Sequence, residues 1–179
     1  MSDMKLLLFC VESNKLKQID WIYIESLIRH FYIEDRDVVR RPVFMNGRSN
    51  YASGKVQREI QSYHKKGYTN IHVLFCVDTD HYEMNTDQKT ELERIVSFCK
   101  SNQYELIWFC HDIEEVLIGH SVPDSEKLAF AKRFANLELY KKIDERKLTK
   151  AAYQKGYSNI KTVLDKFLSR RKLGDSDPQ

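Results

Sequence analysis

The sequence lacks any long hydrophobic run, and its apolar segments, such as KLLLFCV and IHVLFCV, are far too short to span a bilayer. Its first residues carry one lysine and a short apolar run without a small-residue cleavage site, so they do not form a signal-peptide pattern. No internal repeat or low-complexity tract is present. We therefore expect a cytoplasmic protein that has no membrane partner.

The four cysteines include no CxxC pair, which argues against a zinc ribbon or a dithiol redox motif. Cys10 and Cys76 lie inside apolar segments and are expected to be buried, reduced thiols. Cys110 precedes His111, but neighbours at the end of a strand point to opposite faces. We therefore expect no pairing of a cysteine nucleophile with a histidine base at this position.

The sequence also has little excess of one charge over the other, because 29 Lys and Arg against 26 Asp and Glu leave a net charge of only +3. That excess alone does not indicate a nucleic-acid partner. Hydrophobic residues make up 42% of the chain and charged residues 31%, a balance that excludes wholesale disorder. A chain of 179 residues is long enough to bury a core of its own.

Short apolar runs that are typical of buried strands alternate with segments of helical periodicity over residues 1–123. This alternation predicts an α/β core with an open, mostly parallel four-stranded sheet and helices on both faces. Pro42 lacks a backbone N–H and should place its strand at an edge of the sheet. We expect strands at 5–11, 37–45, 71–77 and 104–109, and helices from about 19, at 55–66, at 86–101 and at 113–119.

Residues 124–173 carry only helical signals, which predicts a C-terminal helical extension packed on the core. Its last segment, NIKTVLDKFLSRRK, reads as a basic helix. Such a helix can follow a nucleic-acid backbone, but an ordinary amphipathic helix explains most of the pattern. Residues 174–179 are expected to form a disordered tail.

Acidic residues follow two of the expected strands at the point where each strand ends. Glu12 follows the first strand, and Asp78 and Asp80 follow the third. Ligands of open parallel sheets bind beyond the carboxyl ends of the strands, and the first and third strands are commonly neighbours. If the chain stays extended through Asp80, both aspartates point to the same side.

Three carboxylates in one place repel one another unless they share a cation. Oxygen ligands with few histidines favour Mg²⁺, with Mn²⁺ as a substitute, over zinc. A metal at Glu12, Asp78 and Asp80 suits phosphate chemistry, and Glu12 could act as the general acid or base. The alternative is structural, because aspartates after strands commonly cap helices or form turns.

Five further residues could contact substrate. Basic and aromatic residues around the second strand could hold phosphates, although charges on an edge strand also prevent aggregation. The loop GRSNYASGK is no P-loop, because six residues separate its glycines and valine follows its lysine. The candidates for substrate contact are Arg48, Lys55, His81, His111 and Glu114.

A glutamate after the first strand and an Asp-x-Asp after the third resemble the motifs of a TOPRIM domain. This catalytic fold is shared by type IA and type II topoisomerases, bacterial primases and OLD-family nucleases. In this sequence the matching residues are Glu12, Asp78 and Asp80. The resemblance implies a TOPRIM or Rossmann-like sheet, Mg²⁺ bound by these acids, and cleavage, joining or extension of nucleic-acid backbones.

The sequence is also similar to the small RloB-like or abortive-infection TOPRIM proteins of bacterial phage defence. Asp20, Tyr23 and Leu27 keep the internal spacing of their first segment, and Glu114 in HDIEEVLIG resembles the Phe-Glu of an apolar helix. Ser13 stands where that family usually has glycine, and Asp20 replaces a glutamate. The resemblance covers most of the chain.

Three functions remain open at this point. The first is a Mg²⁺-dependent nuclease of TOPRIM type in phage defence, acting on DNA or RNA. The second is a non-catalytic module that senses a nucleic acid or a partner and acts with an ATPase. The third is a receiver-like signalling domain, which needs two acids after the first strand and one after the third, the reverse of the order here.

Overall fold

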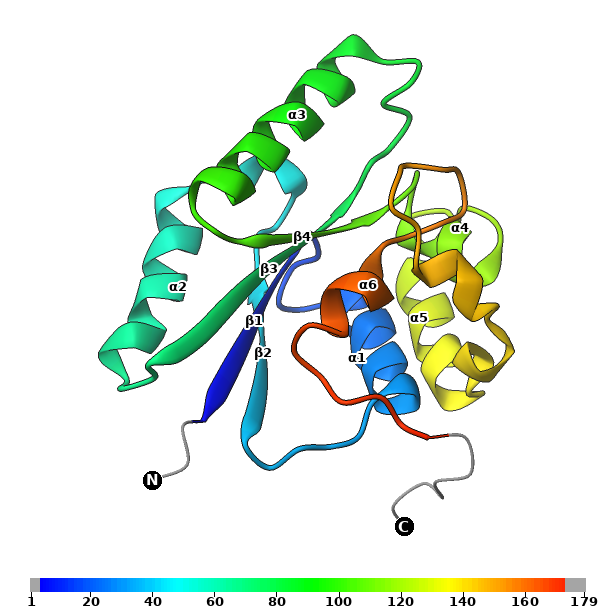
Figure 1. Ribbon diagram of the computed structural model, residues 1–179. Helices are drawn as coiled ribbons and strands as arrows, with labels where there is room; N and C mark the ends of the chain where they lie inside the picture. Colours follow the sequence, from blue (N-terminus) through cyan, green and yellow to red (C-terminus); the bar gives the residue numbers. More distant parts are fainter. Residues whose placement is uncertain (1–3, 173–179) are drawn as a thin grey trace.

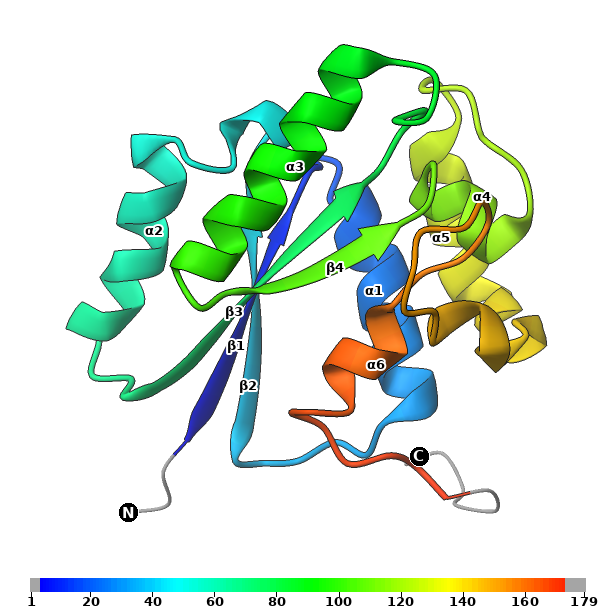
Figure 2. The same cartoon turned by 45° about the horizontal axis from the view of Figure 1, so that its top comes forward.

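The computed structural model describes residues 4–172 and has four parallel strands in a single sheet. The strands lie in the order β2-β1-β3-β4 (Figures 1 and 2). The predicted open, parallel, four-stranded sheet is therefore confirmed, and Pro42 lies on an edge strand as expected. The strands are β1 (Lys5–Val11), β2 (Val38–Phe44), β3 (Asn70–Asp78) and β4 (Glu105–Phe109).

Helices cover both faces of the sheet, because alternate residues of β1 are buried in two different clusters. Leu7 and Phe9 pack with α1 (Ile19–Phe31), whereas Leu6 and Leu8 pack on the opposite face. In Figure 1, α1 shares its face with the later helices. These are α4 (Ile113–Ile118), α5 (Lys127–Asn136) and α6 (Ile160–Leu164), while α2 (Gly54–Lys65) and α3 (Thr86–Ser101) cover the other face.

The order of the strands reverses between β1 and β3. The chain leaves β1 toward β2 on one side and later returns past β1 to β3 on the other. The two central strands pair in register from Lys5 opposite Asn70 to Val11 opposite Cys76. The carboxyl ends of β1 and β3 therefore form the topological switch point, where open α/β sheets bind ligands.

The C-terminal extension is less helical than the sequence predicts. After α5 it forms two short 3₁₀ turns and the five-residue α6, and the helix expected over residues 159–172 ends at Leu164. The chain that follows pairs with the end of α1 instead. Ile33 donates a backbone hydrogen bond to the Ser169 carbonyl at 3.0 Å, and Arg171 donates one to the Phe31 carbonyl at 2.9 Å. The expected tail over 174–179 lies outside the described residues.

The extension shares its hydrophobic core with the sheet. Phe134, Leu148 and Leu164 belong to the same buried cluster as Phe9. Even Lys161 is buried, because its ammonium pairs with Glu145 and lies 4.0 Å from the centre of the Phe31 ring. The segment expected to be a basic helix therefore buries one of its basic side chains, while Lys166, Arg170 and Lys172 stay exposed. No helix in residues 4–172 is long and apolar enough to cross a membrane.

Candidate acidic site at the carboxyl edge of the sheet

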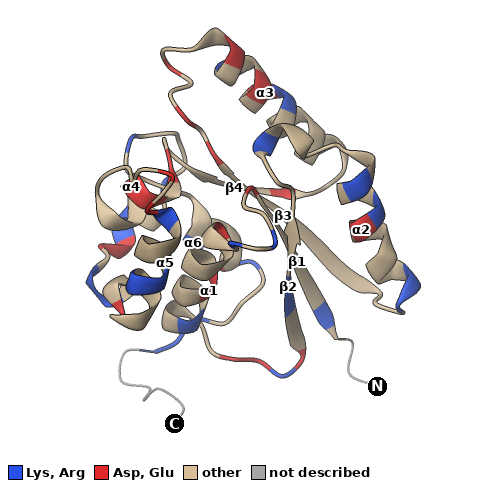
Figure 3. Cartoon of the chain, turned by 180° about the vertical axis from the view of Figure 1, so that it is seen from behind, with Lys and Arg blue, Asp and Glu red and all other residues tan. Residues whose placement is uncertain are grey.

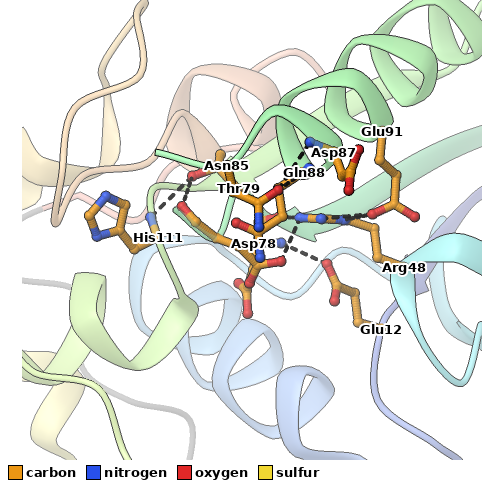
Figure 4. Close-up of polar contacts among 10 residues, drawn as sticks. Glu12, Arg48, Asp78, Thr79, Asn85, Asp87, Gln88, Glu91 and His111 are labelled. Atoms are coloured by element: carbon orange, nitrogen blue, oxygen red, sulfur yellow. Dashed lines mark hydrogen bonds and ion pairs between the residues drawn. The ribbon is translucent and has the colours of Figure 1, made fainter. Parts of the chain in front are cut away.

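A direct contact joins the acids that follow β1 and β3. Glu12 leaves the end of β1, and its Oε1 atom accepts a hydrogen bond from the backbone N–H of Asp78 at 2.8 Å (Figure 4). Both residues are partly buried. The first and third strands are neighbours, as predicted, and Glu12 and Asp78 therefore lie together at the switch point.

Arg48 fills the space beside these acids. Gly47 precedes it with a φ of 110°, a conformation that favours glycine, and directs the loop after β2 back toward β1. The Arg48 Nη1 atom donates to the Asp78 carbonyl at 2.6 Å and lies 3.0 Å from Asp80 Oδ2. Its Nη2 donates to Glu91 Oε2 on α3 at 2.7 Å.

The guanidinium of Arg48 is thus held by protein groups, and the side chain is only 7% exposed. The sequence predicts that Arg48 contacts substrate. In this conformation three acceptors of the protein already occupy its donors, so the guanidinium is not available to substrate. It instead offsets the negative charge of the acidic edge, by which we mean Glu12, Asp78 and Asp80.

Asp80 joins the site in a different way from the prediction. The regular strand ends at Asp78, and Asp80 has a φ of 48°, so the expectation of an extended chain through Asp80 is wrong. Backbone bonds to β4 fix this turn, since Thr79 donates to the Phe109 carbonyl and Asp80 to that of His111, both at 2.9 Å. The Asp80 side chain remains 44% exposed and contacts the other acids through Arg48.

Two more carboxylates extend the site toward the α1 face. Asp20, in the first turn of α1, accepts a hydrogen bond from the backbone N–H of Ser13 at 2.7 Å and so fixes the turn after Glu12. Glu114 on α4 is 1% exposed, and neither of its oxygens has a hydrogen-bond partner. Its carboxylate is therefore turned away from solvent, which does not suit the predicted direct contact with substrate.

Lys127 on α5 supplies the positive charge on this side. Its Nζ atom lies 3.6 Å from Glu114 Oε2 and is about one-quarter exposed. Figure 3 shows acidic positions on α4 beside basic positions on α5. No motif in the sequence singled out Lys127 or Glu91, because Lys127 pairs with Glu114 on another helix and Glu91 pairs with the distant Arg48.

The crowding changes the proton affinity of the carboxylates. Burial, and then repulsion from Asp20, raises the pKa of Glu12 to about 8, although the bond from Asp78 and the charge of Arg48 act in the opposite direction. Burial and the negative charges of Glu12 and Asp20 also raise the pKa of Asp78. When all of them are ionised, the carboxylates of this edge carry more negative charge than Arg48 and Lys127 offset.

The oxygen donors and this charge excess fit a hard divalent cation such as Mg²⁺. The three predicted ligands do not close into a tight cage, however. Within residues 4–172 the only set of three Asp, Glu, His or Cys ligand atoms lying within 4.8 Å of one another comes from Glu83, Cys110 and His111. The acidic edge suits an ion held by one or two carboxylates and several waters, as is usual for Mg²⁺.

The remaining predicted contacts differ in accessibility. Lys55 is exposed in the first turn of α2, and His81 is exposed in the segment after β3. His111 is 8% exposed, and its ring centroid lies 4.6 Å from that of His81. Lys55 and His81 are therefore open to a ligand, whereas His111 is largely enclosed.

The expectation that Cys110 and His111 point apart is wrong. His111 has a φ of 58°, so the alternation of a strand does not continue through it, and donor atoms of both residues approach within 4.8 Å. Burial raises the pKa of the Cys110 thiol, so the sulfur is protonated near neutral pH. A thiol of that kind is a poor nucleophile.

Comparison of the chain with protein-family models, with curated proteins and with solved structures finds no match. The TOPRIM resemblance therefore rests on the position of Glu12, Asp78 and Asp80 at the ends of their strands. Any functional proposal depends on the fold and on the electrostatics of the site.

Proposed function

We propose that the protein is a Mg²⁺-dependent phosphodiesterase of TOPRIM type that cleaves DNA or RNA, with a role in phage defence. The observation that carries the proposal is the hydrogen bond from Asp78 to Glu12, which joins the acids of β1 and β3 at the switch point. The role in phage defence depends on the resemblance to the RloB-like proteins alone.

Asp78 and Asp80 would hold the metal ion, with Glu12 beside it. Their oxygens are the ligands that Mg²⁺ prefers. Burial and neighbouring negative charges raise the pKa values of Glu12 and Asp78, and a bound cation would offset that effect. When bound, Mg²⁺ neutralises phosphate oxygens and orients the attacking and leaving groups. The exposed Lys55 is the side chain that would meet the phosphates of the substrate.

Glu12 is proposed as the residue that carries the proton. One of its oxygens is held by the Asp78 backbone N–H, which orients the carboxyl group and leaves the second oxygen for proton exchange. Asp20 supports this arrangement by fixing the backbone of Ser13, the next residue along the chain.

The test is to incubate the purified protein with end-labelled single- and double-stranded DNA and RNA, with Mg²⁺ or Mn²⁺ present or chelated. We expect metal-dependent cleavage that is lost in Asp78→Asn, and unchanged cleavage in Asp87→Asn, an exposed aspartate on α3. Absence of cleavage on all four substrates, or equal cleavage by Asp78→Asn, would contradict the proposal.

A non-catalytic module that binds nucleic acid or a partner ATPase is the second candidate. The position of Arg48 favours it, because a guanidinium against the Asp78 carbonyl and Asp80 carboxylate supplies an internal cation. Nucleic-acid binding that survives replacement of Glu12, Asp78 and Asp80 together, without cleavage by the unaltered protein, would favour this candidate over the enzyme.

A further inference from the structure

A second group of chemically active side chains lies at the carboxyl end of β4. It contains a carboxylate oxygen of Glu83, the Cys110 sulfur and an imidazole nitrogen of His111, all within 4.8 Å of one another. Cys110 is fully buried and His111 is 8% exposed, whereas the Glu83 side chain is 41% exposed. The group is therefore anchored in the protein on one side and open to solvent on the other.

Backbone contacts to two other segments hold this group in place. The backbone N–H of Cys110 donates to the Tyr157 carbonyl at 2.9 Å, and the Cys110 carbonyl accepts from the backbone N–H of Gly156 at 3.2 Å. The His111 N–H donates to the Thr79 hydroxyl at 3.2 Å (Figure 4). Since these bonds fix the backbone on both sides of the strand end, the sulfur and the ring stay close together before any ligand arrives.

Both nitrogens of the His111 ring face carboxylates. Its Nδ1 atom is buried without an aligned hydrogen bond, while Glu115 Oε2 lies 3.2 Å away. Its Nε2 atom lies 3.1 Å from Glu83 Oε1. A metal-bound histidine commonly has a carboxylate at its second nitrogen, which orients the ring and makes it a better ligand. Glu115 occupies that position in this protein.

We propose that Glu83, Cys110 and His111 bind a zinc ion, a site separate from the acidic edge. Sulfur, imidazole nitrogen and carboxylate oxygen together form the mixed donor set that zinc accepts and that Mg²⁺ does not. Cys110 binds as the thiolate, and its proton is released to solvent when the metal binds. Zinc–ligand lengths of about 2.0–2.3 Å in a tetrahedron place donor atoms ~3.3–3.6 Å apart. The 3.1 Å between His111 and Glu83 is close to that spacing.

His81 supplies the fourth ligand from the same segment as Glu83. Its ring is exposed, and its centroid lies 4.6 Å from that of His111 at an interplanar angle of 64°. A rotation of this exposed side chain is enough to direct a ring nitrogen toward the ion. The proposed set is then one sulfur, two imidazoles and one carboxylate.

Zinc at this position fastens the segment after β3 to the end of β4. His81 and Glu83 follow Asp80, and Cys110 and His111 follow β4 directly. The ion therefore restrains the turn that carries Asp80, in addition to the backbone bond from Asp80 to the His111 carbonyl. Its role is structural, because all four ligand positions are occupied by protein.

The test measures zinc directly in the full-length chain. We expect one zinc per chain after dialysis, and a cobalt-substituted protein with a thiolate-to-metal charge-transfer band. Cys110→Ala should abolish that band, while Cys99→Ala, which removes another buried cysteine, should keep it. Glu83→Gln alters a partly exposed side chain and should weaken zinc binding by about tenfold or more without unfolding the protein.

Further variants distinguish this zinc site from the acidic edge. Asp78→Asn and Asp80→Asn should keep one zinc per chain, and excess Mg²⁺ should not displace it. Less than stoichiometric zinc, or zinc and a cobalt band retained in Cys110→Ala, would overturn the proposal. Zinc lost from Asp78→Asn but not from Glu83→Gln would also overturn it, by placing the ion at the acidic edge. None of these results depends on nuclease activity.

Discussion

The Glu12 carboxylate accepts a hydrogen bond of 2.8 Å from the backbone N–H of Asp78, which lies 66 residues later in the chain. Paired strands of the sheet position both residues of this contact. Glu12 continues β1, Asp78 ends β3, and the two strands pair along their whole shared length. The sheet itself therefore fixes the distance between the Glu12 carboxylate and the backbone of Asp78.

The first prediction concerns the charge of Glu12. Glu12→Gln keeps an oxygen that accepts the Asp78 N–H but can no longer take up or release a proton. If Glu12 carries the proton in catalysis, cleavage should fall about 10²- to 10⁴-fold without a loss of stability. Rates of nucleic-acid cleavage and thermal unfolding measure the two effects. Glu93→Gln, on the exposed side of α3, is the control, and equal rates for both variants would contradict the assignment.

The second prediction is a dependence of stability on pH in the metal-free protein. The pKa of Glu12 is about 8 in the folded chain against an ordinary value of 4.5, so the folded state holds more protons between these values. The free energy of unfolding should therefore fall as the pH rises from about 5 to about 9. Urea unfolding at a series of pH values measures this slope.

Magnesium should counter that loss of stability. The cation binds the ionised carboxylates, so its stabilising effect should grow as the pH rises. Glu12→Gln should remove much of the pH slope, because it removes the group whose pKa is raised to about 8. A slope that is flat or rising, or that is unchanged in Glu12→Gln, would contradict the electrostatics described for this edge.

The third prediction concerns the internal cation at the edge. Arg48→Met leaves Asp80, Glu91 and the Asp78 carbonyl without their common donor. Because both carboxylates are partly exposed, we expect a loss of about 2–3 kcal/mol in unfolding free energy, below the range for fully buried pairs. Arg58→Met on the exposed surface of α2 should change it by about 0.5 kcal/mol or less. Chemical denaturation distinguishes the two, and equal losses would contradict the role given to Arg48.

The fourth prediction tests the ion pair between α4 and α5. Lys127→Met leaves the buried Glu114 carboxylate without the ammonium at 3.6 Å, which should cost about 2–4 kcal/mol near neutral pH. Burial raises the pKa of Glu114, so the loss should shrink in acid as that group takes up a proton.

Two further variants control this experiment. Adding Glu114→Gln to Lys127→Met should restore part of the lost stability, since the double variant leaves no uncompensated charge. Lys132→Met alters an exposed lysine on the same helix and should have little effect. If Lys127→Met and Lys132→Met unfold alike, Lys127 does not balance Glu114.

The sheet could be predicted because its signals are local. The apolar runs predicted both boundaries of all four strands to within one residue, and Pro42 alone was enough to place β2 at the edge. The position of Glu12 and Asp78 followed from the rule for parallel sheets, without knowledge of any side-chain contact.

The sequence could not predict features that depend on distant backbone. The helix expected after Asn159 stops at Leu164, and residues 169–171 pair with the end of α1 instead of continuing it. The left-handed conformations of Asp80 and His111 follow from hydrogen bonds between two loops. Those bonds brought Cys110 and His111 together, against the alternation expected from their neighbouring positions.

The most direct measurement is the anomalous diffraction of a crystal soaked in Mn²⁺. The metal-dependent enzyme requires a peak at the switch point, within coordination distance of oxygens from Asp78 or Asp80 and beside Glu12. A crystal that shows no manganese at this edge, or shows it only among Glu83, Cys110 and His111, would contradict the proposed nuclease.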